Sequence, residues 1–434
     1  MKTKINVDYS AGLIAGPESR VPNSAASLGS GESGASALRG KKVGMVVFSS
    51  YPADPRPRRA AEALLKEGMQ LDLICEGDDR LPTREHLGAL KIFRAPISHH
   101  RGSKLSYAYQ YSAFILISAG ILAWRSLRRR YDLIYVHNMP DILVLSALLP
   151  KALGAKVILD QHDPMPELMM TIFSLEENSF GVRVIRELEK WSMACADLVI
   201  TVNLACKRIF AGRSCRLEKI GIVMNAPDGE IFPYRAARSY SVSKSSSGGP
   251  FVIMYHGSLV ERNGLDLAVD ALAQVRKTVP HAELRIFGSQ TPYLKRVLES
   301  ASRLGVENAV HYFGPKKLED LVHEIEQCDI GVIPNQRNAF TEINTPTRIF
   351  EYLALGKPVV APRTSGILDY FGSDSLFYFE PGSSEALAHQ IAYVSAHRNQ
   401  ALEIAERGQQ VYLAHTWARE RQTFVDLVSG VLTD

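Results

Sequence analysis

The feature that most constrains this 434-residue chain is an alternation of short apolar runs with helical patterns, and this alternation occurs twice. In the first half the apolar runs lie at 43–50, 71–76, 90–95, 132–138, 156–163, 196–203 and 220–227. After a stretch of linker composition the pattern restarts, with runs at 251–258, 283–290, 309–314, 329–335 and 358–361. Apolar runs that alternate with helices are typical of parallel strands covered on both faces. The sequence therefore predicts an α/β protein with two doubly wound parallel sheets.

Composition divides the chain into segments. Residues 1–41 are rich in Ser, Gly and Ala and predict a disordered leader. We expect a first domain over 42–235, a Ser-rich linker over 236–250 and a second domain over 251–412. Residues 413–434 read as an amphipathic helix that needs a docking surface, and we expect this helix to cross back to the first domain.

Charge and cysteine usage exclude several classes of protein. The net charge of +4, without a basic run interleaved with aromatics, does not indicate nucleic-acid binding. The five cysteines form no CxxC pair, and their odd number argues against a disulfide framework, so a reducing cytoplasmic setting is expected. The N-terminus lacks the apolar core of a signal peptide, and no stretch reaches the roughly 18 apolar residues of a membrane-spanning helix.

The segment NTPTRIFEYLALGKPVVA at 344–361 carries the clearest chemical signal. It predicts a loop, a short helix over 349–355, a stop at Gly356 and a strand that opens at Pro358. Arg348 and Glu351 would then lie at a helix N-terminus, where backbone N–H groups and the helix dipole attract anions. This combination suits a nucleoside diphosphate, with the carboxylate on ribose hydroxyls.

The order and spacing of several motifs resemble a known family, the retaining nucleotide-sugar glycosyltransferases of family 4 (group 1). In the first half the matching motifs are DPRPRRAAEALLKEG, DLIYVHNMPDILV, VILDQHDPMPEL and ADLVITV, and in the second half they are HGSLVERNGLDLAVDAL, RIFG, HYFG, DIGVIPN and FEYLALGKPVVA. The resemblance implies the GT-B fold, in which two Rossmann-like domains face each other across a cleft. It is strongest to bacterial enzymes that build lipopolysaccharide, capsule or exopolysaccharide.

The resemblance also implies an activity. The enzyme would transfer a hexose-type sugar from a nucleoside-diphosphate sugar to a saccharide or lipid-linked acceptor, with retention of configuration. The second domain would bind the donor and the first the acceptor, with no metal or other cofactor. Two alternatives stay open: a nucleotide-sugar 2-epimerase of the same fold, and an inactive partner of another transferase.

Eight donor-binding residues follow from the resemblance: Gly257, Ser258, Arg262, Gly264, Gly288, Thr345, Arg348 and Glu351. In the turn after the first strand of the second domain, the family usually has basic residues at two positions, which hold Ser258 and Asn263 in this chain. Arg262 is therefore the natural substitute. The alternative is that Arg262 is a solvated turn residue. A guanidinium could bond phosphate oxygens and offset the charge of the leaving diphosphate. For Glu351 the alternative is a helix N-terminal acid worth roughly 0.3–1 kcal/mol, and for Gly288 it is a simple strand-to-helix turn.

Two residues are expected to be catalytic, His162 and Glu342. His162 ends a predicted strand, where open α/β sheets place ligand sites. By resemblance it would contact the transferred sugar and assist orientation and electrostatics. The family usually carries a glutamate eight positions before Glu351, but this position is Ile343. Either the adjacent Glu342 replaces it or the role is absent, and the second option favours the inactive partner.

On the acceptor side we expect four residues, His137, Asn138, Asp163 and Glu167. His137 could equally be a packed residue at a strand end, and Glu167 could equally cap the helix that follows it. A metal site formed by Asp160, His162 and Asp163 is another interpretation, although strand alternation separates Asp163 from the other two. The resemblance favours catalysis without a metal.

The stretch YSAFILISAGILAWRSLRRR at 111–130 joins an apolar helix to a basic end. The simpler interpretation is a helix buried in the first domain with its basic end exposed. The alternative is a peripheral contact with anionic lipid at the inner face of the plasma membrane, to which each basic residue would contribute about 1 kcal/mol.

Overall fold

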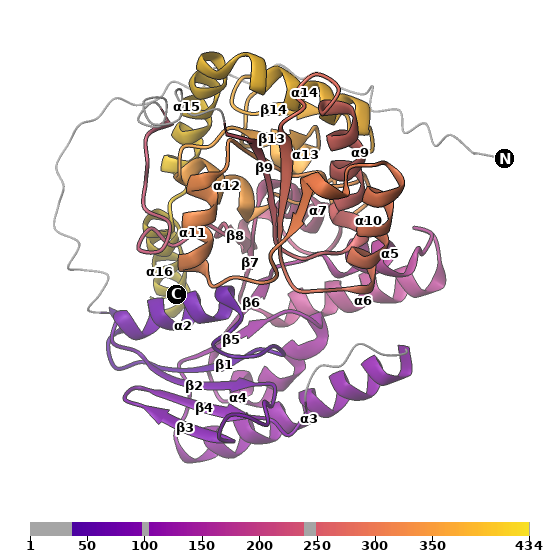
Figure 1. Ribbon diagram of the computed structural model, residues 1–434. Coiled ribbons are helices and arrows are strands. Elements are labelled where there is room, and N and C mark those ends of the chain that lie inside the picture. Colours follow the sequence, from indigo (N-terminus) through magenta and orange to yellow (C-terminus); the bar gives the residue numbers. More distant parts are fainter. Residues whose placement is uncertain (1–36, 98–103, 238–248, 434) are drawn as a thin grey trace.

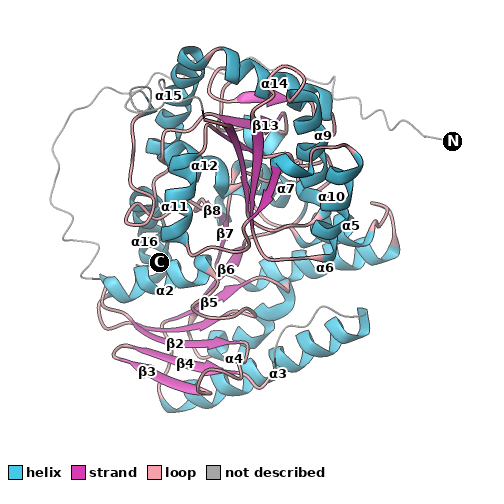
Figure 2. Cartoon of the chain, in the orientation of Figure 1, coloured by secondary structure: helices cyan, strands magenta, loops and turns pink. Residues whose placement is uncertain are grey.

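The computed structural model describes residues 37–97, 104–237 and 249–433, and it contains two parallel sheets flanked by helices (Figures 1 and 2). The predicted α/β class with two doubly wound sheets is confirmed. The leader at 1–36 and most of the linker, 238–248, lie outside the described residues. Within the predicted leader, Leu38 is fully buried in the first core, so the folded part begins before residue 42.

The first domain is built on an eight-stranded sheet with the order β3-β4-β2-β1-β5-β6-β7-β8. Its strands are β1 (Lys42–Val46), β2 (Gln70–Cys75), β3 (Arg84–Leu87), β4 (Leu90–Arg94), β5 (Leu133–His137), β6 (Lys156–Gln161), β7 (Leu198–Thr201) and β8 (Ile220–Ile222). Only the β3–β4 pair is antiparallel. The sequence did not predict β3, because this largely exposed edge strand of sequence REHL has no apolar run.

Helices cover both faces of this sheet (Figure 2). They are α2 (Pro55–Lys66), α3 (Lys104–Arg128), α4 (Leu148–Ala152), α5 (Met165–Phe173), α6 (Phe180–Cys195) and α7 (Leu204–Arg213). Helix α2 begins where Asp54 accepts a hydrogen bond from the Arg56 backbone, with Pro55 in the first turn, and this is the arrangement that starts helices. A 3-10 turn at Asp141–Ala147 precedes α4.

The second domain has a six-stranded, fully parallel sheet with the order β11-β10-β9-β12-β13-β14. Its strands are β9 (Phe251–His256), β10 (Ala282–Phe287), β11 (Val310–Tyr312), β12 (Ile330–Val332), β13 (Val359–Pro362) and β14 (Phe377–Phe379). The helices are α9 (Leu265–Val275), α10 (Pro292–Arg303), α11 (Leu318–Gln327), α12 (Thr347–Ala354), α13 (Ser365–Leu368), α14 (Ser384–Ala396) and α15 (Arg398–Ala414).

The last helix, α16 (Trp417–Thr433), leaves the second domain and packs against α2 of the first (Figure 1). Its Phe424, Val425 and Val428 are buried in the same apolar cluster as β1 and β2. The chain passes from the first domain to the second near Met224, which is buried in the core of the second domain together with Phe232. Met224 and Phe232 thus already pack on the second domain ahead of the predicted linker.

The carboxyl ends of the two sheets meet at the domain interface. Asn203, just after β7, donates from Nδ2 to the Ile343 carbonyl (2.8 Å) and to Thr345 Oγ1 (3.1 Å) in the loop before α12. An ion pair between Arg208 and Asp369 (2.6 Å) lies nearby. Open α/β sheets bind ligands beyond the carboxyl ends of their strands, so this interface is the place to look for a site.

Candidate active site

The second domain brings the ends of β9 and β10 close together through glycines. A Cβ on Gly288 would lie 2.2 Å from the Gly257 carbonyl oxygen, and one on Gly264, which has φ +63°, would lie 2.0 Å from the Pro334 carbonyl oxygen. Only glycine permits this approach of backbone to backbone. Gly257 and Gly288 thus lie against each other after β9 and β10, and we call this pair the glycine surface. Gly264 lies against Pro334 after β12, at the same carboxyl edge of the sheet.

Arg348 spans this edge from α12. Its Nη1 donates to the His256 carbonyl (2.8 Å), its Nη2 lies 3.3 Å from Asn335 Oδ1, and its guanidinium carbon lies 4.8 Å from the centre of the Tyr255 ring. The side chain also runs past Gly257, where a Cβ would lie 3.2 Å from Arg348 Cδ. These contacts fix a cation beside the glycine surface.

Glu351 lies one turn further along α12, against His256 at the end of β9. Its Oε2 is 3.3 Å from His256 Nε2, and 14% of the Glu351 side chain is exposed. Burial raises the pKa of Glu351 to about 7, although Arg348 and Arg59 act in the opposite direction. Burial lowers the pKa of His256 to about 3, and the charge of Arg348 adds to this effect. The imidazole is thus neutral at pH 7, and the contact is a polar one rather than a salt bridge.

The buried face of α2 contributes two arginines that the sequence did not identify as site residues, Arg56 and Arg59. Arg59 donates to the Ala226 carbonyl and lies close enough to Glu351 for their charges to interact across the domain interface. Burial and repulsion from Arg56 lower the pKa of Arg59 to about 10. The spacing of the two arginines, three residues apart in a helix, places them on one face, and this was the available signal.

His162 belongs to a hydrogen-bonded group at the ends of β5 and β6. Its Nε2 lies 2.8 Å from His137 Nδ1, while Tyr135 OH donates to Asp160 Oδ2 (2.7 Å). Arg56 binds Asp160 through Nε and Nη2, the shorter bond being 2.6 Å. Burial opposes ionisation of Asp160, but Arg56, His162 and His137 together outweigh it and hold the pKa of this carboxyl well below its usual range.

Exposure separates the members of this group. His137 is fully buried, and burial lowers its pKa well below the usual value, which fits the packed strand-end interpretation. The His162 side chain remains 17% exposed. Its Nδ1 takes part in none of the hydrogen bonds found among the described residues. His162 is therefore the member that could meet a substrate, and the others orient it.

The same group offers a test of the metal interpretation. Ligand atoms of His137, Asp160 and His162 lie within 4.8 Å of one another. Both carboxylate oxygens of Asp160 are already bound by Arg56, which also places a positive charge beside them. Asp163, which the sequence suggested as a ligand, is not a member. This donor set fits a cation poorly.

Asp163 and Arg262 approach each other from the two domains. Burial raises the pKa of Asp163, while the charges of His162 and Arg262 lower it. The Arg262 guanidinium also lies 5.7 Å from the centre of the Phe340 ring. Arg262 is therefore an interface residue rather than a solvated turn residue. The predicted acceptor-side Asp163 and donor-side Arg262 both face the same interface.

Asn138 and Glu167, the two other residues expected on the acceptor side, are both engaged within the first domain. Asn138 is buried, donates to Gln161 Oε1 (2.6 Å) and accepts from the His162 backbone (2.9 Å), so it fixes the loop that carries His162. Glu167 is held by both terminal nitrogens of Arg213 (2.6 and 2.9 Å). Arg213 also binds the buried Glu189 (2.7 Å). Glu167 thus belongs to a buried ion-pair cluster of the first domain and does not present a free carboxylate to an acceptor.

The predicted catalytic Glu342 is likewise engaged elsewhere. Its Oε1 accepts from the Ser365 backbone at the start of α13 (3.0 Å), and its Oε2 pairs with Arg337 (3.1 Å). Its neighbour Ile343 is buried in an apolar cluster of the first domain. Thr345, which was predicted to bind the donor, donates a hydrogen bond from its hydroxyl to the Gly366 carbonyl (2.7 Å). These three residues hold the loop in place.

Ser258, like the neighbouring Gly257, is exposed. Its carbonyl accepts from Tyr255 OH and from Asn263 Nδ2, both at 2.8 Å. The turn between β9 and α9 is thus braced through its backbone, and Asn263 has a structural role in it.

Comparison with known protein families matches both halves of the chain. The description "Glycosyltransferase Family 4" matches residues 58–230, and "Glycosyl transferases group 1" matches residues 238–411. Among curated relatives, "Probable glycosyltransferase WbjE" of Pseudomonas aeruginosa is 21% identical over 55% of this chain and 59% of its own length. The GDP-mannose-dependent alpha-(1-6)-phosphatidylinositol monomannoside mannosyltransferase of Mycolicibacterium smegmatis is 31% identical over 39% of this chain and 45% of its own. The chain thus spans about half the length of the curated relatives it matches.

Solved structures share the fold over most of the chain. HepE of Anabaena, in complex with UDP-glucose, has a TM-score of 0.66 at 18% identity and covers 90% of this chain and 99% of its own. WaaG, a glycosyltransferase involved in lipopolysaccharide biosynthesis, has a TM-score of 0.64 at 15% identity, with coverage of 89% and 100%. The fold is therefore GT-B. Together these matches show that the chain belongs to the glycosyltransferases, with a family 4 domain at residues 58–230 and a group 1 domain at residues 238–411.

Proposed function

We propose that the chain transfers a sugar from a nucleoside-diphosphate sugar to a saccharide or lipid-linked acceptor with retention, in the synthesis of a bacterial surface polysaccharide. The observation that carries the proposal is Glu351 beside Arg348 at the glycine surface of β9 and β10. A carboxylate suits ribose hydroxyls, and a cation beside close backbone suits a diphosphate. The solved complex of HepE with UDP-glucose supports this class of donor.

In this proposal the interface supplies positive charge without a metal. The oxygen of the acceptor hydroxyl bonds to C1 of the sugar, and the bond from C1 to the phosphate oxygen breaks. The nucleoside diphosphate leaves with the electron pair, and its phosphate oxygen takes the hydroxyl proton. Arg262 and Arg348 would offset the negative charge that develops on this leaving group. His162 would orient the sugar through its exposed edge, since His137 and Asp160 lie against its Nε2 on the buried side.

A ligand screen tests the proposal. Nucleoside diphosphates and their sugars are added to the purified chain, and the melting temperature is followed. A ligand at a hundred times its dissociation constant stabilises a protein by roughly 2.7 kcal/mol. The matched variant Glu351→Ala should lose most of this stabilisation, and an equal response in both proteins would contradict the assignment.

Product analysis then separates the alternatives. Transfer or slow donor hydrolysis by the chain alone supports the transferase and excludes an inactive partner. Conversion of the donor sugar without any acceptor would indicate a 2-epimerase instead. His162→Ala should lower turnover with little change in melting temperature, because His162 is a partly exposed member of its group.

We also propose that α3 contacts an anionic membrane, where a lipid-linked acceptor would reside. Helix α3 carries four large apolar side chains that are 59–73% exposed: Tyr109, Leu116, Trp124 and Leu127. Arg128, Arg129 and Arg130 follow and are also exposed. Among the described residues no helix is both long and apolar enough to cross a membrane. Flotation with acidic vesicles at low salt should recover the protein, and Leu116→Ser should reduce the recovery.

A further inference from the structure

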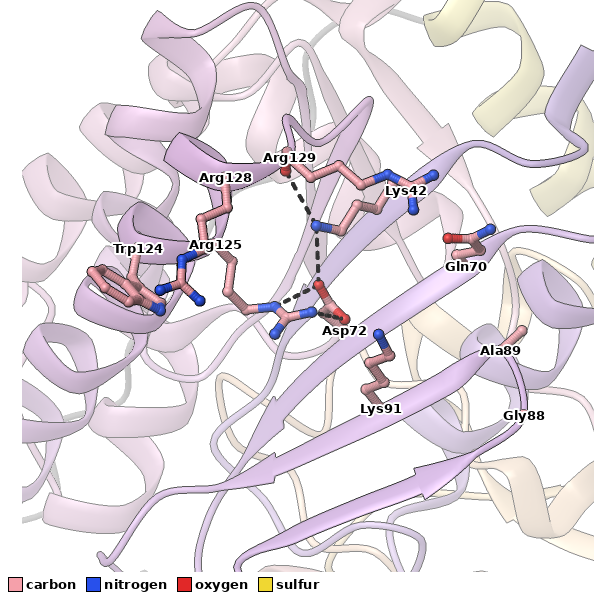
Figure 3. Close-up of a pocket in the computed structure, with 10 residues that line it drawn as sticks. All are labelled: Lys42, Gln70, Asp72, Gly88, Ala89, Lys91, Trp124, Arg125, Arg128 and Arg129. Carbon is pink, nitrogen blue, oxygen red and sulfur yellow. Dashed lines mark hydrogen bonds and ion pairs between the residues drawn. The ribbon is translucent and has the colours of Figure 1, made fainter.

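The first domain contains a cavity of about 440 Å³ that the proposed reaction does not use (Figure 3). We call it the basic pocket. Its lining residues come from the starts of β1 and β2, the β3–β4 hairpin and the last turns of α3: Lys42, Gln70, Asp72, Gly88, Ala89, Lys91, Trp124, Arg125, Arg128 and Arg129.

The basic pocket lies at the opposite edge of the sheet from the candidate active site. Lys42 and Gln70 are the first residues of their parallel strands, whereas His137 is the last residue of β5. Five strand residues separate the two edges of β1, and at about 3.3 Å per residue the edges are roughly 15 Å apart. A ligand in the basic pocket would therefore be distinct from a donor at the domain interface.

Charge is the main property of this cavity. Five cationic side chains and one carboxylate line it, so its formal charge is five minus one, or +4, which equals the net charge of the whole chain. The carboxylate, Asp72, is fully engaged. Arg125 binds it through Nε and Nη2 (both 2.7 Å), Tyr131 OH donates to it (2.7 Å), and Lys42 Nζ lies 3.4 Å away.

The remaining cations have no anionic partner within the described chain. The side-chain nitrogens of Lys91, Arg128 and Arg129 enter none of the hydrogen bonds or ion pairs found there, although Arg128 lies 4.0 Å over the Trp124 ring. Burial lowers the pKa of Lys42, and the charges of Arg125 and Arg129 add to this effect, whereas Asp72 opposes it. The cations thus repel one another, and an anion in the cavity would relieve that repulsion.

A simpler explanation is that these arginines only complement the carboxyl-terminal dipole of α3. This role at the helix end does not explain all the cations of the pocket. The Arg129 carbonyl accepts its bond from Lys42 Nζ (3.1 Å), so a strand residue already serves the helix end. In Figure 3, Lys91 comes from the hairpin strand on the other side of the cavity and points toward Asp72. Cations from both walls thus face one cavity.

We propose that the basic pocket is a second ligand site that binds a phosphoryl group. A cavity of this volume falls in the range of small-molecule sites. Guanidinium and ammonium groups together are the side chains that hold phosphate oxygens. Trp124, stacked with Arg128, provides a flat wall against which the body of a phosphorylated sugar or lipid headgroup would lie.

The first experiment uses inorganic pyrophosphate as the probe, titrated by calorimetry at constant ionic strength. Pyrophosphate is expected to occupy the donor site as well, so the wild-type protein should show two classes of site. The double variant Lys91→Ala with Arg128→Ala should lower the pyrophosphate affinity of one class of site at least tenfold. Arg262→Ala should lower the affinity of the other class. The control pair Arg183→Ala with Lys190→Ala removes two exposed cations from α6 and should change neither.

The second experiment identifies the source of the phosphoryl group. Two kinds of phosphatidylcholine vesicle are prepared, one with phosphatidic acid and one with phosphatidylglycerol. Both contain the same fraction of acidic lipid. A preference for phosphatidic acid that Lys91→Ala abolishes indicates a lipid headgroup, whereas pyrophosphate binding without that preference indicates a free ligand. Arg129→Gln serves as a second variant should the double variant melt at a lower temperature. The proposal is overturned if the pocket variants bind pyrophosphate and both vesicles as the control pair does.

Discussion

The buried carboxyl of Glu351 should make the stability of the second domain depend on pH. Burial raises its pKa from 4.5 to about 7. Between these values the folded protein keeps a proton that the unfolded chain releases, so the free energy of unfolding falls as pH rises through this window. At 1.36 kcal/mol per unit, the 2.5-unit difference corresponds to about 3 kcal/mol, fully expressed above pH 7.

Glu351→Gln removes this dependence while preserving shape. The amide stays neutral, so the variant and the wild type should be similar in stability near pH 4.5 and differ by up to about 3 kcal/mol at pH 8, with the variant the more stable. For a domain of this size each kcal/mol shifts the melting temperature by about 2–4 °C, so roughly 6–12 °C is expected at pH 8. Other titrating groups cancel in the comparison.

The assay is thermal unfolding of both proteins from pH 4.5 to 8, with Glu299→Gln as the control. Glu299 lies on α10 of the same domain with 61% of its side chain exposed, so its variant should follow the wild type at every pH. At pH 8 the variant Glu351→Gln should be more stable than the wild type but should bind a nucleoside diphosphate more weakly. A difference in stability between wild type and Glu351→Gln that stays constant across the pH range would refute the reasoning.

Three further predictions follow from single contacts. Arg56→Ala should cost about 3–5 kcal/mol by urea unfolding, because it leaves the buried Asp160 carboxylate unpaired; a loss below 1 kcal/mol would contradict this. Asn203→Asp keeps the oxygen that caps α7 but replaces the Nδ2 donor by an oxygen that faces acceptors of the other domain, so faster limited proteolysis near the interface is expected. Gly264→Ala should lower both melting temperature and donor affinity, since its Cβ would collide with the Pro334 carbonyl, and unchanged donor affinity would argue against a site there.

The sequence predicted the parts of the fold that rest on apolar periodicity. The parallel strands, the helix carrying Glu351 and the terminal helix all have continuous or amphipathic apolar patterns. Strand β3 lacked such a signal because it is polar and largely exposed. Strand β14 has the apolar sequence FYF but was not among the predicted runs. Site prediction rested on the ends of strands, where topology brings polar residues together.

What could not be predicted was which polar group bonds which. Glu167 and Arg213 are 46 residues apart, and only the fold brings α5 and the end of α7 close enough to make them partners. Asp160 looked available as a ligand, but Arg56, which is 104 residues away, occupies it. A carboxylate in a sequence carries no mark of whether a cation already neutralises it, because long-range pairing is a property of the assembled fold.

The position of Ile343 bears most directly on catalysis. Its side chain is buried against apolar residues of the first domain, and its carbonyl is bonded by Asn203, so this position joins the two domains. An ionised carboxylate there would be desolvated without a partner, which is costly. The two oxygens of the neighbouring Glu342 are held by the Ser365 backbone and by Arg337. We infer that sugar transfer in this chain would depend on His162 and on the cations Arg262 and Arg348, and not on a second carboxylate in the loop before α12.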